Sequence, residues 1–362
     1  METWILFLVK AFSSGTPILY GTLGEIVNEK SGHLNLGVQG MMAVGGCAGF
    51  LTGYYSNNLF LALFAAFLTS LIYAFLTVTL MANQNVTGLT LTIFGVGLAN
   101  FIGKFALNRT PTGTLKLPDG IAGQLKDIRF PFLEKIPGVG PWLYTLFSFN
   151  IFVYLAVAIA VVLAVYINHT KTGRNLRAIG ENPAAADAAG IHVTRMKYIH
   201  LLLGGGICGL GGAYASMIIG NGVWISDFIG DLGWIALALV IFAAWNPGKA
   251  VLGSFLFGAL RVLRFYLSSL ILVFADLFPG IRRPIESLAS GVQSIPGAFY
   301  DMLPFLMTAL VLVVTSMRKS RERLQPASCG INYFREDSPD GKTGGVPYKT
   351  PVDPLTGTRG GF

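Results

Sequence analysis

Charged residues are scarce in this sequence. Asp, Glu, Lys and Arg make up 12% of its 362 residues, whereas an average soluble domain has about 25%. Hydrophobic residues make up 53%, and the mean hydropathy is +0.60. A soluble domain of this size needs a charged surface to remain dissolved. The composition therefore excludes an ordinary soluble protein and indicates an integral membrane protein.

Residues that build metal, redox or nucleophilic sites are also few. The four histidines have no metal-ligand spacing, and no nucleophile stands beside a partnered base. Residues 341–343 read Gly-Lys-Thr, but Glu336 stands where a phosphate-binding loop has its first glycine. The three cysteines give neither a disulfide framework nor a metal spacing: Cys47, Cys208 and Cys329. We therefore expect no enzymatic activity, no metal, no cofactor and no ATP hydrolysis in this chain.

The basic excess, a net charge of +8, does not indicate nucleic-acid binding. Most Lys and Arg residues lie in loops and after Met317, with no basic patch on a soluble fold. Such residues are typical of cytoplasmic loops that face anionic lipid. We expect these basic residues to contact the lipid bilayer, and we expect no nucleic acid as a partner.

The hydrophobic runs predict an all-α bundle of about nine spans, with a range of eight to ten, because one span needs about 20 apolar residues. We expect the first run to be interrupted at residues 15–17, Gly-Thr-Pro. It begins at Trp4 without a basic leader, so we expect the first helix to be retained. Residues 1–317 form the predicted membrane domain and 318–362 a disordered tail. The predicted spans are 4–27, 36–53, 59–81, 86–107, 142–167, 199–219, 228–244, 250–270 and 299–317.

Charge bias predicts the orientation. Residues 318–323 carry four basic side chains directly after a hydrophobic run, which is typical of the cytoplasmic side. Counting back through the spans places loop 168–197 inside, loop 108–141 outside and the N-terminus outside. Segment 278–298, with Arg282, Arg283 and Glu286, is a candidate interfacial helix.

Loop 171–191 has the pattern of a short helix. Asn182 is a good N-cap, Pro183 suits the first helical position, and Gly190 suits a left-handed stop after an alanine-rich stretch. The helix is either an ordinary connector or a knob that docks into a groove on a cytoplasmic partner.

Segment 24–42 interrupts a hydrophobic region with glycines and polar residues. Irregular backbone survives at membrane depth only where protein or a water-filled cavity surrounds it. A charge such as Glu25 at the centre of a span costs about 2.5–3.5 kcal/mol on insertion scales. We favour a broken second helix beside a transport pathway over a plain cytoplasmic turn.

Further polar groups lie in or beside spans. Asn83 and Asn85 open the fourth span, Asn100 lies within it, and Asn246 ends the seventh. Arg261 and Arg264 share one helix face, where they either snorkel to the outer surface or contact a substrate. The glycines at 204–212 indicate close helix packing.

The order and spacing of several stretches resemble the permease subunits of bacterial ABC importers in the branched-chain amino acid, ribose and simple-sugar superfamily. These stretches are 24–42, with Ser-Gly-His-Leu-Asn-Leu-Gly-Val-Gln-Gly-Met-Met, then 84–103, 174–191, and 233–258 with Trp-Asn-Pro. The resemblance is greatest to the nucleoside-type permeases that work with basic-membrane-protein lipoproteins. Residues 231–234 depart from it, since Asp-Leu-Gly-Trp replaces the usual Gly-Arg-Gly-Trp.

The resemblance implies roles for particular residues. It implies that the segment after residue 173 contacts the ATPase, through Arg174, Asn175, Arg177, Glu181, Asn182, Pro183, Ala186 and Gly190. It implies that residues 32–40 line the translocation path. Together with the polar groups above, the candidate path residues are Glu25, Asn35, Gln39, Asn83, Asn85, Asn100, Trp234 and Asn246.

The expected protein is thus a permease in the bacterial cytoplasmic membrane. Its expected partners are cytoplasmic ATPase subunits that bind ATP and Mg²⁺, a second related permease, and an external substrate-binding lipoprotein. Amide and aromatic side chains suit a polar, uncharged, ring-bearing solute such as a nucleoside, with a simple sugar or a riboflavin-like vitamin as alternatives. The rivals from other classes are a stand-alone carrier or channel and a structural or signalling membrane subunit.

Overall fold

The computed structural model describes residues 2–68, 71–277, 282–317 and 325–333. These residues form helices joined by short irregular segments, and among them the only β-type pairings are two isolated bridges, Lys116 with Val223 and Ile128 with Phe149. The prediction of an all-α helix bundle is confirmed.

Most of the long helices follow hydrophobic runs of the sequence, whereas α10 and α15 lie in polar segments. In chain order they are α1 (Glu2–Lys30), α2 (Val38–Ser56), α3 (Leu59–Phe67), α4 (Leu71–Ala74), η2 (Phe75–Thr79), α5 (Gln84–Leu107), α6 (Asp119–Gln124), α7 (Pro131–Glu134), α8 (Gly140–Leu146), α9 (Ile151–His169), α10 (Lys171–Glu181), α11 (Pro183–Ala188), α12 (Val193–Tyr214), η3 (Ala215–Ile219), α13 (Leu232–Phe242), α14 (Pro247–Leu277), α15 (Arg282–Gln293), α16 (Gly297–Asp301) and α17 (Leu303–Met317).

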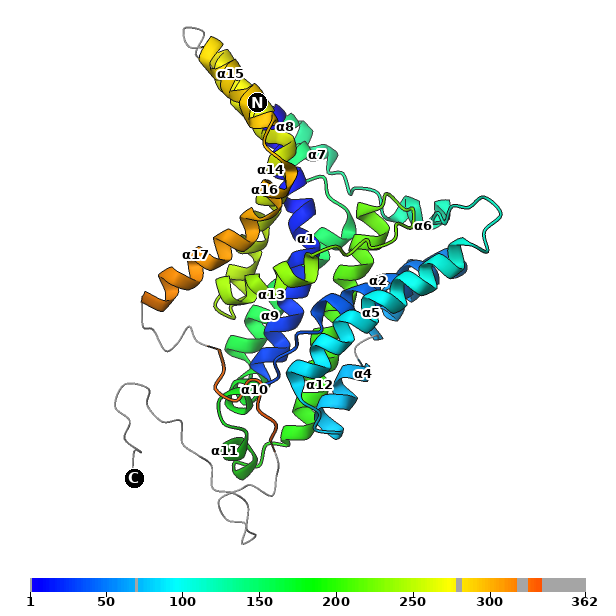
Figure 1. Ribbon diagram of the computed structural model, residues 1–362, viewed down its shortest axis with the longest axis vertical. Helices are drawn as coiled ribbons and strands as arrows, with labels where there is room; N and C mark the ends of the chain where they lie inside the picture. Colours follow the sequence, from blue (N-terminus) through cyan, green and yellow to red (C-terminus); the bar gives the residue numbers. More distant parts are fainter. Residues whose placement is uncertain (1, 69–70, 278–281, 318–324, 334–362) are drawn as a thin grey trace.

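Helix α1 runs through the middle of the bundle and packs against α12, α13 and α14, while α12 also packs against α2 (Figure 1). Glycines allow these backbones to approach closely. A Cβ on Gly45 of α2 would collide with the backbone of Gly209 in α12, and one on Gly24 would collide with the carbonyl of Gly204. The packing predicted for residues 204–212 is therefore confirmed.

The predicted interruption at residues 15–17 is wrong, because α1 continues through Pro17. Proline has no N–H, so the carbonyl of Ser13 lacks its intrahelical partner. The hydroxyl of Tyr214 in α12 donates to this carbonyl at 2.9 Å. A long-range contact thus replaces the missing helical bond.

Two further predictions are corrected. The single span expected at 142–167 is two helices, α8 and α9, because Asn150 caps α9 by accepting from the N–H of Phe152 at 3.1 Å. The loop expected before residue 182 contains the helix α10, which Thr170 caps through the N–H of Gly173 at 3.0 Å.

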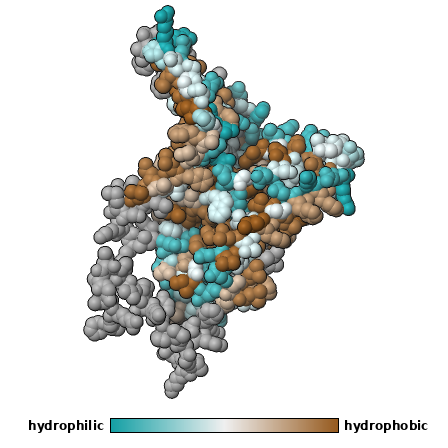
Figure 2. Space-filling view, in the orientation of Figure 1, coloured by the Kyte–Doolittle hydropathy of each residue, from teal (hydrophilic) through white to brown (hydrophobic). Residues whose placement is uncertain are grey.

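Four helical segments in the described part are long and apolar enough to cross a bilayer: Gln84–Leu107, Ile151–His169, Val193–Ile219 and Pro247–Val273. A fifth candidate is the pair Arg282–Gln293 and Gly297–Val311, which is bent by 85°. The number of about nine spans stays a prediction. Large apolar side chains are exposed on the outer helices, including Phe60, Ile93, Phe101, Val162 and Leu252, and much of the face in Figure 2 is apolar. Lipid covers such surfaces in a membrane protein.

Opposite ends of the molecule carry different elements. Helices α10 and α11 lie at one end, and α7 and α8 lie at the other, near the N-terminus (Figure 1). Hydrophilic residues gather over α10 (Figure 2). Residues 325–333, from the segment expected to be disordered, pack at the α10 and α11 end. The rest of that segment lies outside the described residues.

Candidate functional site

The helix break expected in segment 24–42 lies at residues 31–37, between α1 and α2. Glu25 holds it together from within α1. One oxygen of the Glu25 carboxylate accepts from the N–H of Asn35 at 3.0 Å, and the other accepts from the amide of Asn28 at 3.0 Å. The side chain of Asn35 then accepts from the N–H of Gly37 at 2.9 Å, just before α2 begins.

Side chains from neighbouring helices satisfy the rest of this irregular backbone. Gln84 at the start of α5 accepts from the N–H of Leu34 at 2.9 Å, and Tyr73 of α4 donates to the Leu34 carbonyl at 2.8 Å. Thr92 donates to the carbonyl of Leu36 at 2.8 Å. Protein therefore surrounds the break, which is the condition under which irregular backbone is tolerated within a membrane.

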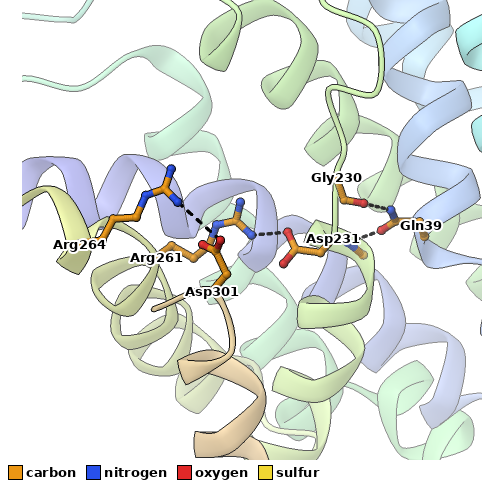
Figure 3. A network of polar contacts seen from close by, with 7 residues as sticks. Gln39, Gly230, Asp231, Arg261, Arg264 and Asp301 are labelled. Carbon is orange, nitrogen blue, oxygen red and sulfur yellow. Dashed lines mark hydrogen bonds and ion pairs between the residues drawn. The ribbon is translucent and has the colours of Figure 1, made fainter. Parts of the chain in front are cut away.

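Gln39 joins the start of α2 to the start of α13. Its side-chain oxygen accepts from the N–H of Gly233 at 2.7 Å, and its amide donates to the carbonyl of Gly230 (Figure 3). Asp231 lies between these two glycines and pairs with Arg261 of α14 at 2.5 Å. The start of α13 is thus held from both α2 and α14.

The structure distinguishes the two arginines of α14. Arg261 pairs with Asp231 and also lines a cavity. Arg264 reaches toward Asp301, at 3.5 Å (Figure 3). Its guanidinium also lies over the ring of Phe265. Both therefore have partners inside the chain, and Arg261 is the one placed to meet a solute.

A cavity of about 1100 Å³ opens between α1, the segment after α6, the segment just before α9, α12 with η3, and α14. It is about as large as the largest ordinary small-molecule sites, which range from roughly 300 to 1,000 Å³. Its uncharged polar lining comes from Ser13, Ser14, Ser148, Asn150, Tyr214 and Asn221. Its charged lining comes from Lys10, Lys126, Asp127, Arg129 and Arg261. Basic side chains thus outnumber acidic ones.

Sequence reasoning missed this cavity. Its residues come from segments far apart in the chain, and none of the eight candidate path residues lines it. Two local signals could have pointed to it. Ser13 and Ser14 precede the helical Pro17, and Asn150 has the residue type of an N-cap within an apolar run.

The candidate path residues do not form one cluster. Glu25, Asn35 and Gln39 are buried and hold backbone groups, as described above. The others lie apart and serve mostly as helix ends: Asn83 caps α5, Asn246 accepts from the N–H groups of Gly248 and Lys249, Asn100 accepts from the N–H of Asp227, and Asn85 and Trp234 are exposed. Their role as path residues stays a prediction.

The candidate coupling residues do lie together, in α10 and α11. Arg174, Arg177 and Glu181 are exposed on α10, while Leu176 and Ile179 are buried on its other face. The remaining candidates are the half-buried Asn175, the capping residue Asn182, Pro183, Ala186 and Gly190.

The short helix has the predicted ends. Asn182 accepts from the N–H of Ala185 at 3.0 Å, Pro183 is the first helical residue, and Gly190 has a φ of 82°. However, Ala186 is only 3% exposed, because it packs against Ile179 and Val193. The outward face of α11 consists of Ala185 and Ala188, followed by Ala189.

Within the described residues, no group of three or more His, Cys, Asp or Glu side chains is arranged to hold a metal ion. The arrangement can hold a polar solute at one end and offer a contact surface at the other.

Comparison with known proteins identifies the family. Residues 7–312 match the family described as the permease component of the branched-chain amino acid transport system. No solved structure matches. The match covers nearly the whole helical part of the chain.

Similar proteins include a nucleoside ABC transporter permease of Lactococcus lactis, which is 31% identical, over 88% of this chain and 94% of that protein. A guanosine ABC transporter permease of Bacillus subtilis is 30% identical, over 88% of this chain and 93% of its own. A Haloferax volcanii protein, provisionally assigned as a glucose ABC permease, is 31% identical, over 89% and 95%.

Permeases of this kind work with an ATPase and a substrate-binding partner. They are transport components and not enzymes. With the family match and the helix bundle, this chain belongs to the branched-chain amino acid transport system permease family, as a multi-pass membrane subunit of an ATP-binding cassette importer.

Proposed function

We propose that this permease carries nucleosides inward and that the cavity of about 1100 Å³ receives them. The cavity is the observation that carries this proposal. The segments that line it lie toward the end of the bundle opposite α10 and α11 (Figure 1), and its lining combines uncharged hydrogen-bonding groups with basic side chains.

The chemistry of the lining favours a solute with many acceptors. Lys126, Arg129 and Arg261 are donors only, while serine and asparagine side chains both donate and accept. The carbonyls and ring nitrogens of a base, and the hydroxyls of a ribose, match such groups. The nucleoside and guanosine permeases among the relatives support the same choice.

A simple sugar is the second candidate, because one relative of similar identity is provisionally a glucose permease. The hydroxyls of a sugar can accept hydrogen bonds from the same donors.

In the complete importer, the cavity end faces the exterior and receives solute from an external binding lipoprotein. A second related permease completes the pathway. Two ATPase subunits bind ATP and Mg²⁺, contact α10 and α11 from the cytoplasm, and switch the bundle from outward to inward opening. Relatives that occur as two permease types in Lactococcus lactis support a pair of different permeases.

The test is ATP-dependent uptake by the reconstituted importer, with labelled guanosine, ribose and riboflavin measured in parallel. We expect guanosine uptake that requires ATP and the binding protein. Uptake of ribose or riboflavin without any nucleoside would exclude the nucleoside assignment and leave the importer in place. Uptake without an ATPase subunit would exclude the importer mechanism.

A variant of the cavity adds a control. Tyr214→Phe keeps the aromatic face but removes the hydroxyl that donates to the carbonyl of Ser13. We expect it to change the KM for solute more than Tyr20→Phe does, because Tyr20 donates to the carbonyl of Phe152 and is not among the residues lining the cavity.

A further inference from the structure

Residues 325–333, which we call the C-terminal strap, lie across the end of the bundle that carries α10 and α11. The strap has its own local structure. The N–H of Cys329 donates to the carbonyl of Pro326 at 3.0 Å, the N–H of Ile331 donates to the carbonyl of Ser328 at 3.1 Å, and Gly330 has a φ of 83°. Pro326 and Ser328 are buried.

The strap binds the end of α10. Both the N–H and the hydroxyl of Ser328 donate to the carbonyl of Gly180, at 2.9 and 2.6 Å, and the hydroxyl also lies 3.1 Å from the carbonyl of Ile179. These carbonyls belong to the last turn of α10, where a helix leaves its carbonyls without intrahelical partners. The fit is close, since a Cβ on Gly180 would lie 3.3 Å from Pro326.

A second contact joins the strap to the helix break. The amide of Asn332 donates to the carbonyl of Met81 at 2.6 Å, and its oxygen accepts from Gln84 at 3.0 Å. The other end of the same Gln84 side chain accepts from the N–H of Leu34 in the break. One glutamine therefore connects the strap to residues 31–37.

Two more contacts complete the arrangement. The hydroxyl of Tyr333 donates to the carboxylate of Asp187 in α11 at 3.1 Å, and its ring packs against the cluster that contains Ile179, Ala186 and Val193. Gln325 lies 3.5 Å from Glu29, near the end of α1.

From these contacts we propose that the C-terminal strap links the coupling helices to the helix break, so that movement of α10 and α11 reaches α1, α2 and α5. Ser328, Asn332 and Tyr333 are its positioning residues. The strap is hydrogen-bonded to α10 and α11 on one side and, through Gln84, to the helix break on the other. Because its own turn keeps it compact, a displacement of α10 and α11 passes through the strap to the break. The inference rests on the proposed contact of α10 and α11 with the ATPase.

The test uses the complete importer in liposomes and measures solute moved per ATP hydrolysed. Asn332→Ala removes the contacts of the strap with Met81 and Gln84, and Tyr333→Phe removes its hydrogen bond to Asp187 of α11. For Tyr333→Phe, which removes one hydrogen bond, we expect solute moved per ATP to fall roughly fivefold. Asn332→Ala removes two hydrogen bonds, so we expect at least as large a fall. Basal ATP hydrolysis belongs to the partner and should stay at its normal rate.

The matched control is Ile331→Ser, because this side chain lies in the same strap and is 50% exposed. It should leave the coupling ratio unchanged. A chain that ends at Leu324 should lose coupling, and one that ends at Arg335, which keeps the strap, should retain it. If the shorter chain fails to assemble, the point variants decide.

Cys329 reports directly whether the strap is docked. Burial, and to a smaller extent the nearby Glu29 carboxylate, raise the pKa of the Cys329 thiol above its ordinary value. Since the thiolate is the reactive form, alkylation should be slow in the docked strap and faster in Asn332→Ala. Peptide mapping locates the label at Cys329.

Two results would overturn the proposal. One is a variant whose Cys329 reacts rapidly while the transport ratio stays normal. The other is transport and ATP hydrolysis that fall together, which is what a purely structural role predicts. Ala185→Arg on α11 distinguishes failure of the strap proposal from failure of the proposed contact between α11 and the ATPase. If Ala185→Arg leaves ATPase stimulation intact, α11 does not couple to the ATPase.

Discussion

The buried polar side chains of this permease act chiefly on its backbone. Glu25 accepts the N–H of Asn35, Gln39 holds the start of α13, and Tyr214 supplies the donor that Pro17 lacks. A buried polar group that loses its partner is costly. Such residues therefore determine where helices end and which neighbours they hold.

Replacement of Glu25 tests this structural role. Glu25→Ala leaves the N–H of Asn35 and the amide of Asn28 without acceptors, so we expect the free energy of unfolding to fall by about 1–3 kcal/mol. Glu25→Gln keeps one acceptor and should lose less. Thermal unfolding of the detergent-solubilised protein measures the effect.

Glu134→Ala, in the exposed short helix α7, is the control and should be neutral. If Glu25→Ala leaves the unfolding temperature unchanged while transport is lost, Glu25 acts on the solute and not on the backbone.

At the scale of elements, α10 and α11 form one unit. Ile179, Ala186 and Val193 pack together and orient the short helix, so Ala186 is part of its interior. A partner meets the exposed Ala185 and Ala188. The contact surface therefore consists of small alanine side chains, and the packing of Ile179, Ala186 and Val193 fixes its position.

Ala185→Arg places a long charged side chain on that surface. We expect normal membrane insertion, loss of transport, and loss of the ATPase stimulation that the loaded binding protein causes. The measurement is ATPase rate and uptake in the same liposomes. Thr112→Arg, an exposed position in the segment between α5 and α6, should be silent. Normal uptake in Ala185→Arg would make α11 a plain connector.

At the scale of the whole molecule, the cavity and the coupling unit lie toward opposite ends of one bundle (Figure 1). Helix α1 connects them, since its first half lines the cavity and its last turns meet the break and the strap. A change at one end can thus reach the other through a single packed element.

The predicted orientation is open to direct test. Single cysteines at Ala189 and Asp119, both exposed, should be labelled from opposite sides of the membrane in intact cells. We expect an impermeant reagent to reach Asp119→Cys from outside and Ala189→Cys only after the membrane is opened. Labelling of Ala189→Cys from outside would reverse the orientation.

The sequence by itself determined that the protein lies in a membrane, that its fold is all-α, and where some helices begin and end. Low charge and long apolar runs allow only a membrane bundle. Asn182 and Gly190 act through neighbouring backbone groups, so the roles predicted for them follow from spacing. The family resemblance was also readable, because it depends on the order of short stretches along the chain.

Only the tertiary structure decided what depends on distant partners. Pro17 does not interrupt α1 because Tyr214, almost two hundred residues away, satisfies Ser13. The cavity combines side chains from α1, the segment before α9, α12 and α14, and the strap finds its partners in α5, α10 and α11. Composition and periodicity describe each residue's own segment. They carry no information on which remote donor pairs with an unpaired carbonyl. In this protein such long-range pairs position the cavity and the coupling helices.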